Sequence, residues 1–254
     1  MLQVLDSPDI QSDTLQVKSL ILVKSTNSGI SLIILINKKY LTFAAEKKMK
    51  NINLYNVDWT KIPEPKGGED LSHLIGFTLP DVILPDTGGN DIDLRKLNEL
   101  TVIYIYPLSG QPNKELPNGW DEIPGARGCT PQSCSFRDNY KDLIQHNVSQ
   151  VFGLSSQTTS YQKELAKRLN LPYTILSDEH MVLEKELNLP TFHADGLKLF
   201  KRITLITKGG KIINYFYPIF PPDKNVKDVL DWLNTTNSYE HTNITQQRIC
   251  RAFQ

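Results

Sequence analysis

Two of the three cysteines of the chain, Cys129 and Cys134, lie five residues apart where the sequence predicts the start of a helix. Pro131 suits the first helical position, because its missing N–H would have no partner there, and Thr130 suits the N-cap before it. Apolar residues then recur at helical spacing and give the helix one apolar face: Phe136, Tyr140, Leu143 and Ile144.

This context predicts chemical reactivity for Cys129. The residue is expected at the positive end of the helix dipole and close to Arg127, and both features favour the thiolate over the thiol. Since the thiolate is the nucleophile, Cys129 is a candidate catalytic residue. The alternative for any free cysteine is an inert, buried thiol. Cys250, in a polar tail, is expected to be a bystander.

The spacing of the pair restricts how the two thiols can combine. A helix rises about 1.5 Å per residue, so Cys129 and Cys134 are separated by about 7.5 Å along the axis. A disulfide needs Cα atoms within about 7 Å, so the two should not bridge while the helix is intact. We therefore expect an ordered reduced form and a locally unfolded disulfide form. The histidines show no paired spacing with the cysteines, which disfavours zinc.

Composition excludes several classes of protein. Lys and Arg together number 28, as do Asp and Glu, so no net charge points to nucleic acid or to an anionic membrane. Three cysteines in 254 residues argue against a disulfide-stapled secreted scaffold. The early acidic residues do not suit a secretory signal, and the most apolar run, residues 30–36, is too short to span a bilayer. We expect a cytoplasmic protein.

The N-terminal region differs in composition from the rest of the chain. It is either an over-extended reading frame upstream of Met49 or a real appendage, with a strand pair around Ser19–Val23 and Ser31–Ile36. A Pro- and Gly-containing stretch then precedes a longer patterned region. The expected organisation is an extension (1–48), a lead-in segment (49–71), a main domain (72–233) and a polar tail (234–254).

The main domain reads as an α/β fold. Residues 101–106 are β-branched or aromatic without polar alternation, as expected of a fully buried central strand. Strand–helix–strand units followed by a hairpin predict a mixed sheet covered on both faces. The expected strands are 77–79, 82–84, 101–106, 148–154, 173–176, 202–207 and 211–216; the expected helices are 129–145, 160–169, 179–187 and 226–233, with a short helix or turn at 93–100.

Six short motifs follow one another through this domain. They are Phe77-Thr-Leu-Pro-Asp81, Val102-Ile-Tyr-Ile-Tyr-Pro107, Gly128-Cys-Thr-Pro-Gln-Ser-Cys-Ser-Phe-Arg-Asp138, Gly153-Leu-Ser-Ser156, Leu176-Ser-Asp-Glu179 and Arg202-Ile-Thr-Leu-Ile206. In this order they resemble the peroxiredoxins, in particular the bacterioferritin-comigratory or peroxiredoxin Q-like branch. The resemblance covers residues 72–233.

The resemblance implies a thioredoxin-like fold and thiol-dependent reduction of hydrogen peroxide and organic hydroperoxides. By position, Cys129 would be the peroxidatic cysteine and Cys134 the resolving one, joined in an intramolecular disulfide after oxidation. Arg202 would hold the thiolate and the peroxide, and Arg137 would support that arginine or the helix end. Thr130 is a candidate hydroxyl donor. A thioredoxin-type dithiol would recycle the disulfide. No metal, haem or flavin is needed, and a monomer or homodimer is expected.

Two departures from the family pattern keep a second interpretation open. In the Pro-x-x-x-Thr-x-x-Cys motif, Ala126 stands at the Thr position and Glu122 at the Pro position. Loss of one hydroxyl donor at a developing oxyanion costs about 10²–10³ in rate. A non-enzymatic redox sensor or binding protein on the same fold is therefore the alternative to a peroxidase. The loop Ser109–Gly125 is longer than usual. With Trp120 at its centre, it either lines the peroxide pocket or a partner surface, or it is a surface loop whose Trp packs on the body.

Overall fold

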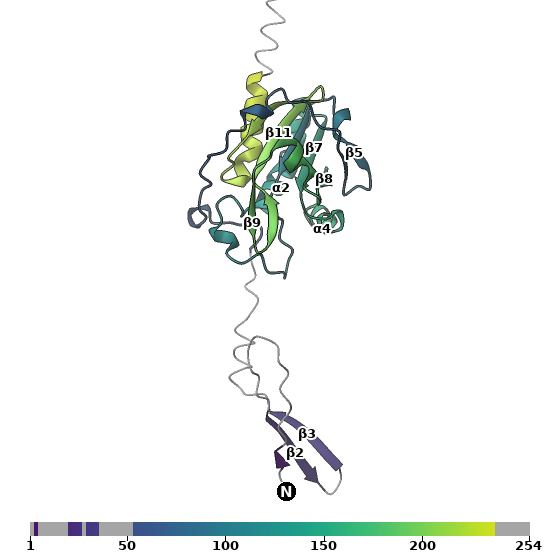
Figure 1. Ribbon diagram of the computed structural model, residues 1–254, viewed down its shortest axis with the longest axis vertical. Helices are drawn as coiled ribbons and strands as arrows, with labels where there is room; N and C mark the ends of the chain where they lie inside the picture. Colours follow the sequence, from purple (N-terminus) through teal and green to yellow (C-terminus); the bar gives the residue numbers. More distant parts are fainter. Residues whose placement is uncertain (1–2, 5–19, 27–28, 36–52, 237–254) are drawn as a thin grey trace, which may run out of the picture. The chain divides into compact units, whose positions relative to one another are not determined.

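The computed structural model describes residues 3–4, 20–26, 29–35 and 53–236, and the chain divides into two compact units, 1–51 and 52–254. The first unit contains an antiparallel sheet of order β1-β2-β3 (Figure 1), formed by β1 (Gln3–Val4), β2 (Leu20–Thr26) and β3 (Gly29–Leu35). Cys250 and the tail beyond residue 236 lie outside the described residues.

A five-stranded sheet of order β12-β11-β6-β7-β8 forms the centre of the second unit. The three strands β6, β7 and β8 run parallel, whereas β11 is antiparallel to both β6 and β12, so the sheet is mixed as expected. Its strands are β6 (Thr101–Ile105), β7 (Gln150–Ser155), β8 (Thr174–Ser177), β11 (Ile203–Lys208) and β12 (Lys211–Phe216).

Helices pack against both faces of this sheet. They are α2 (Cys129–Asp138), α3 (Tyr140–Gln145), α4 (Thr159–Leu169), α5 (Val182–Leu187) and a C-terminal helical segment over 225–236. Short 3₁₀ turns are η1 (Trp59–Lys61), η2 (Ser72–Leu74), η3 (Leu94–Lys96), η4 (Trp120–Glu122) and η5 (Pro222–Lys224). No helix among the described residues is long and apolar enough to cross a membrane.

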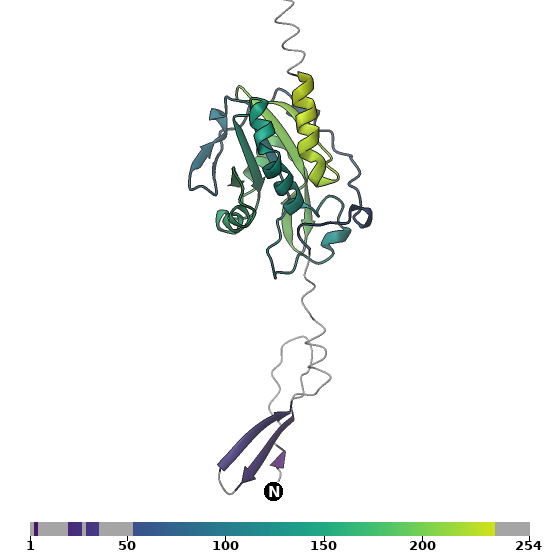
Figure 2. The same cartoon turned by 180° about the vertical axis from the view of Figure 1, so that it is seen from behind.

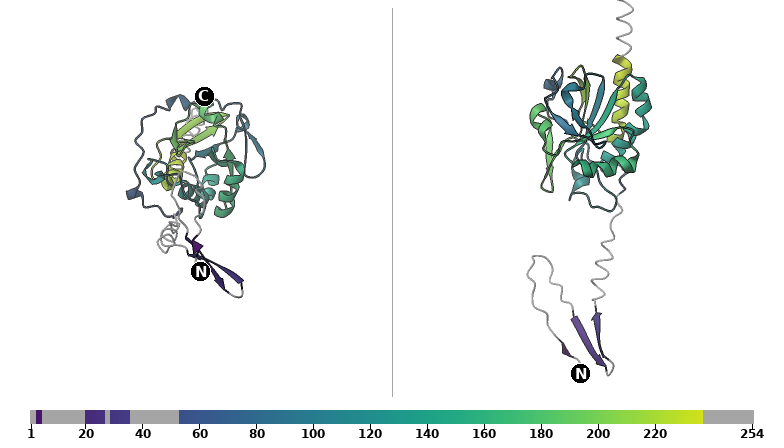
Figure 3. Two further views of the ribbon diagram at one scale, coloured as in Figure 1. Left: turned by 60° about the horizontal axis from the view of Figure 1, so that its bottom comes forward. Right: turned by 90° about the vertical axis from the view of Figure 1, so that its right-hand side faces the viewer.

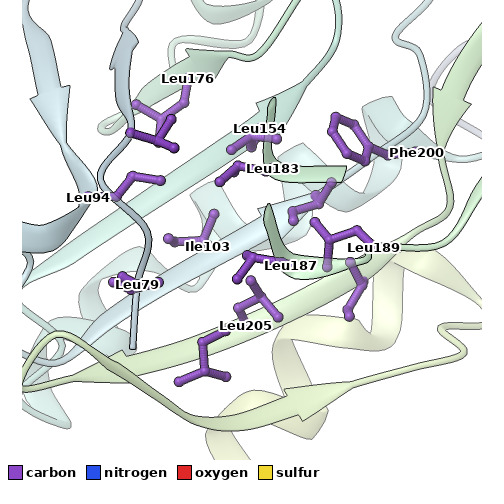
Figure 4. Packing of buried hydrophobic residues seen from close by; sticks show 14 of the residues in the cluster. Leu79, Leu94, Ile103, Leu154, Leu176, Leu183, Leu187, Leu189, Phe200 and Leu205 are labelled. Atoms are coloured by element: carbon purple, nitrogen blue, oxygen red, sulfur yellow. The ribbon is translucent and has the colours of Figure 1, made fainter. Parts of the chain in front are cut away.

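The side chains of β6 alternate between two hydrophobic cores. Ile103 and Ile105 face a cluster that includes Leu183 and Leu187 of α5 (Figure 4). Val102, Tyr104 and Tyr106, which follows the strand, face a second cluster that includes residues of α2, α4 and the C-terminal segment. Figures 2 and 3 show the yellow C-terminal segment beside the teal cysteine helix on one side of the sheet. Because every residue of β6 is buried, its unbroken apolar pattern indicated the centre of the sheet correctly.

Several local expectations were wrong. Gly128, not Thr130, is the N-cap of α2, and Cys129 rather than Pro131 is its first residue. The helix expected over 129–145 is broken at Asn139 into α2 and α3. The strand expected at 77–79 is reduced to one bridge, Thr78 to Lys211.

Two small antiparallel sheets complete the second unit. The hairpin of β9 (Thr191–Ala194) and β10 (Leu197–Phe200) was not anticipated, because its alternation is short and half-buried. A further pair, β4 (Ile83–Pro85) and β5 (Asp91–Asp93), is joined by residues 86–90.

Candidate active site

The helix that carries both cysteines begins at a glycine that no other residue can easily replace. Gly128 has φ +108°, a left-handed conformation that side chains disfavour. A Cβ at this position would lie 2.6 Å from the Trp59 ring and 2.8 Å from Cγ of Pro222. The turn therefore delivers Cys129 to the first position of α2, where unpaired backbone N–H groups and the helix dipole favour negative charge.

Arg202 meets Cys129 at this helix start. Its Nη2 lies 3.2 Å from Cys129 Sγ, and both residues are only 3% exposed. A guanidinium in such contact stabilises a thiolate by charge and by hydrogen bonding. The two residues are 73 positions apart in the sequence, and the antiparallel pairing of β11 with β6 brings Arg202 to the end of β6.

The buried guanidinium is held by oxygen acceptors. Its Nη2 also lies within hydrogen-bond distance of the carbonyls of Ala126 (3.2 Å), Arg127 (3.3 Å) and Gly125 (3.4 Å). Its Nη1 donates to Oε1 of Gln132. These acceptors offset the cost of burying the charge, and they fix the loop before Cys129 around the same group that contacts its sulfur.

Gln132 extends this network behind the site. It lies one turn after Cys129 and donates through Nε2 to Oδ1 of Asn225, at 3.0 Å. Thr204 of β11 donates to the same Oδ1 at 2.6 Å. Sequence reasoning missed both Gln132 and Asn225; the only signal was a polar residue three positions after Cys129, on the helix face that turns out to be buried.

Two tyrosines hold the middle of α2 in place by hydrogen bonds to Ser133. Tyr104 donates to Oγ of Ser133 at 3.1 Å, and that hydroxyl donates to the Cys129 carbonyl at 3.0 Å. Tyr173 donates to the Ser133 carbonyl at 2.9 Å. The ring of Tyr104 stacks on Phe136 with centroids 4.5 Å apart. Burial raises the pKa of both tyrosines well above the ordinary value, so both remain protonated donors.

Cys134 lies in the same helix and is half-buried against the second core cluster. Both Cys129 and Cys134 are free thiols in this structure, as expected for an intact helix. Burial raises the pKa of Cys134, and the charge of Arg137 opposes that effect. Arg137 bonds the carbonyl of Leu169 at 2.9 Å and the carboxylate of Asp138 at 2.8 Å. The charge of Arg137 thus acts on Cys134, and none of the hydrogen bonds described for Arg137 reaches Arg202.

A small cavity of about 10 Å³ opens beside Cys129. Thr130, 3% exposed, lines it, and so does Trp120, which also packs against Phe192 with ring centroids 6.1 Å apart. The structure therefore confirms that Trp120 packs on the body, and it also places the ring in the wall of this cavity. The full lining is Leu54, Leu108, Gly110, Leu116, Trp120, Arg127, Gly128, Cys129 and Thr130.

A larger cavity of about 440 Å³ includes Arg202 in its lining but not Cys129. Ala126, at the position of the family threonine, is fully buried and lines neither cavity. It meets the site through its carbonyl, which faces Arg202 and lies 3.7 Å from Cys129 Sγ. Among the described residues, no group of three or more His, Cys, Asp or Glu side chains could hold a metal ion.

Comparisons with known proteins identify the family of the chain. The Redoxin family model matches residues 75–231. Peroxiredoxin bcp1 of Schizosaccharomyces pombe is 36% identical over 156 residues, which cover 60% of this chain and 71% of that protein. The chloroplastic peroxiredoxin Q of Sedum lineare is 30% identical over 161 residues, which cover 63% of this chain and 77% of that protein.

Among solved structures, peroxidoxin BcpB of Mycobacterium tuberculosis superposes with a TM-score of 0.52 at 23% identity, over 63% of this chain and 96% of that chain. This likeness supports the thioredoxin-like fold. The family model and the two sequence relatives go further: the chain belongs to the Redoxin family and, within it, to the peroxiredoxins, which are thiol-dependent peroxidases.

Proposed function

We propose that this peroxiredoxin reduces hydroperoxides through Cys129, and one observation carries the proposal: Arg202 Nη2 lies 3.2 Å from Cys129 Sγ, at a helix start that lines a small cavity. The Cys129 thiolate attacks the terminal oxygen of the peroxide. The O–O bond breaks, water or an alcohol leaves after taking up a proton, and Cys129 becomes a sulfenic acid. Arg202 stabilises the charge that moves from sulfur to the departing oxygen.

Other donors around the cavity share this task. The family threonine is replaced by Ala126, so its hydroxyl is missing. Thr130 brings a buried hydroxyl-bearing side chain to the cavity wall, and Arg127 brings a second guanidinium. We propose that these two residues, with the N–H groups at the start of α2, compensate for the missing hydroxyl.

Cys134 then resolves the sulfenic acid. Its sulfur attacks Cys129 Sγ, water leaves, and a Cys129–Cys134 disulfide forms. Since an intact helix keeps the two residues too far apart, the first turns of α2 must unwind. Unwinding breaks the bond from Ser133 to the Cys129 carbonyl and the stacking of Tyr104 on Phe136. A dithiol reductant of the thioredoxin type then restores both thiols by exchange.

We further propose a reducing, cytoplasmic setting and a monomer or homodimer. The low cysteine count supports the reducing setting, because the disulfide-rich scaffolds of oxidising compartments carry more cysteines. Peroxide and a dithiol protein are then the two reaction partners.

Two cysteine variants test the assignment of roles. Cys129→Ser is expected to abolish peroxide consumption. Cys134→Ser is expected to leave the first oxidation intact and to stop at a sulfenic acid, seen by mass spectrometry as a gain of about 16 Da, one oxygen. If Cys134→Ser instead blocks the first oxidation, the roles are reversed.

The substitution at Ala126 favours one competing function, a redox sensor without efficient turnover. Wild-type oxidation at the rate of free cysteine, with an intact fold, would support the sensor and contradict the peroxidase.

A further inference from the structure

A short segment that precedes the family domain lies against the active site. The Redoxin match begins at residue 75, whereas residues 53–61, which we call the strap, contact the loop and helix that carry Cys129. The strap therefore brings to the active site residues that lie outside the region matched by the family model.

Three contacts hold the strap in place. The carbonyl of Asn53 accepts a 2.7 Å hydrogen bond from Nη2 of Arg127, which itself lines the cavity. The hydroxyl of Tyr55 accepts a 3.0 Å bond from Arg168, whose guanidinium lies 5.8 Å from the tyrosine ring centroid. Trp59 packs edge-on against Phe220, with centroids 5.9 Å apart. These contacts fix the strap at both of its ends.

Leu54, between the first two anchors, forms part of the cavity wall. Its side chain is 8% exposed although the residues on either side of it are exposed. It packs so closely on Gly110 that a Cβ there would lie 2.7 Å from Leu54 Cδ2. With Leu54 in place the cavity beside Cys129 measures about 10 Å³, which is the space of one water-sized sphere.

We propose that Leu54 is a specificity-determining residue that restricts the peroxide site to small hydroperoxides. The inference rests on the proposed role of Cys129. Hydrogen peroxide carries no hydrocarbon and needs only a little more space than the cavity offers. A branched hydroperoxide such as tert-butyl hydroperoxide carries a four-carbon group, comparable in size to the leucine side chain itself. Such a group can occupy this cavity only where a wall residue such as Leu54 is displaced or shortened.

The test compares second-order rate constants for oxidation of Cys129 in the full-length protein by hydrogen peroxide and by tert-butyl hydroperoxide. In Leu54→Ala the ratio of the first constant to the second is expected to fall about tenfold or more, the discrimination typical of one added methylene in a hydrophobic pocket. Leu54→Val should give a smaller fall in the same direction. Leu197→Ala, which removes a 47% exposed leucine on β10, is the matched control and should leave the ratio unchanged.

A folded Leu54→Ala protein whose ratio stays within about twofold of the wild type would overturn the proposal, since loss of a steric barrier must act on the larger peroxide. If circular dichroism shows that Leu54→Ala does not fold, the Leu54→Val ratio decides by the same criterion.

Alkylation of Cys129, followed by peptide mass spectrometry, separates this proposal from the proposed function. Leu54→Ala should accelerate N-ethylmaleimide more than iodoacetamide, whatever the peroxide rates. Equal acceleration of the two reagents would contradict the steric role. If wild-type Cys129 is oxidised by peroxide no faster than free cysteine, the proposed function is wrong. If Leu54→Ala still accelerates N-ethylmaleimide more than iodoacetamide in that case, the steric role of Leu54 remains supported.

Discussion

Replacement of Arg202 by methionine is expected to slow the oxidation of Cys129 without unfolding the domain. Arg202 donates one charge-assisted hydrogen bond to the sulfur, and methionine keeps a comparable length of side chain without charge or donors. A hydrogen bond to a charged group contributes about 1.5–3 kcal/mol. At about 1.36 kcal/mol per factor of ten in rate, the second-order rate constant should fall by about 10- to 160-fold.

Stopped-flow mixing of the reduced protein with hydrogen peroxide measures this rate constant. The matched control is Lys201→Met, because Lys201 is the neighbouring cation but pairs with Glu69 instead of Cys129. The control should oxidise at the wild-type rate. A folded Arg202→Met protein that reacts within about threefold of the wild type, well below the loss expected for a charged hydrogen bond, would refute the assignment of Arg202 to the thiolate.

Three further changes follow from the same structure. Gly128→Ala should lower the free energy of unfolding by about 1–3 kcal/mol in chemical denaturation, because the left-handed backbone and the nearby Trp59 ring leave a Cβ no space; unchanged stability would contradict this. Gln132→Leu should slow oxidation less than Arg202→Met does, since Arg202 keeps its backbone acceptors; a larger loss would mean that Gln132 itself contacts peroxide. His146 has both ring nitrogens against oxygen acceptors, and these hydrogen bonds raise its pKa. The contribution of His146 to stability should be fully present below its unfolded pKa of about 6.5 and lost as pH rises through its higher folded pKa. The free energy of unfolding should therefore decline between these two pKa values in the wild type but not in His146→Ala.

The cysteine helix and the central strand could be predicted from local patterns. The unbroken apolar run at 101–106 indicated full burial, and the apolar spacing after Cys134 indicated a helix. The exact start of that helix could not be predicted, because it depends on Gly128 adopting a left-handed conformation between Trp59 and Pro222. A glycine before the cysteine is a weak signal by itself.

The site itself was less accessible to sequence reasoning. No local pattern places Arg202 against Cys129; only the register between β11 and β6 does so, and the family resemblance was needed to anticipate it. Leu54 gave no signal at all, since a leucine in a lead-in segment has no periodic partners. Its burial results from tertiary packing on Gly110.

The proposed mechanism requires that Cys129 react first with peroxide and that Cys134 then form a disulfide with it. The most direct measurement mixes the reduced wild-type protein with hydrogen peroxide in a stopped-flow instrument and follows tryptophan fluorescence, to which Trp120 in the cavity wall should contribute. Mass spectrometry then maps the disulfide in the product. We predict a fast second-order phase and a Cys129–Cys134 bridge. A phase no faster than free cysteine, or a product in which Cys129 is not bridged to Cys134, would contradict it.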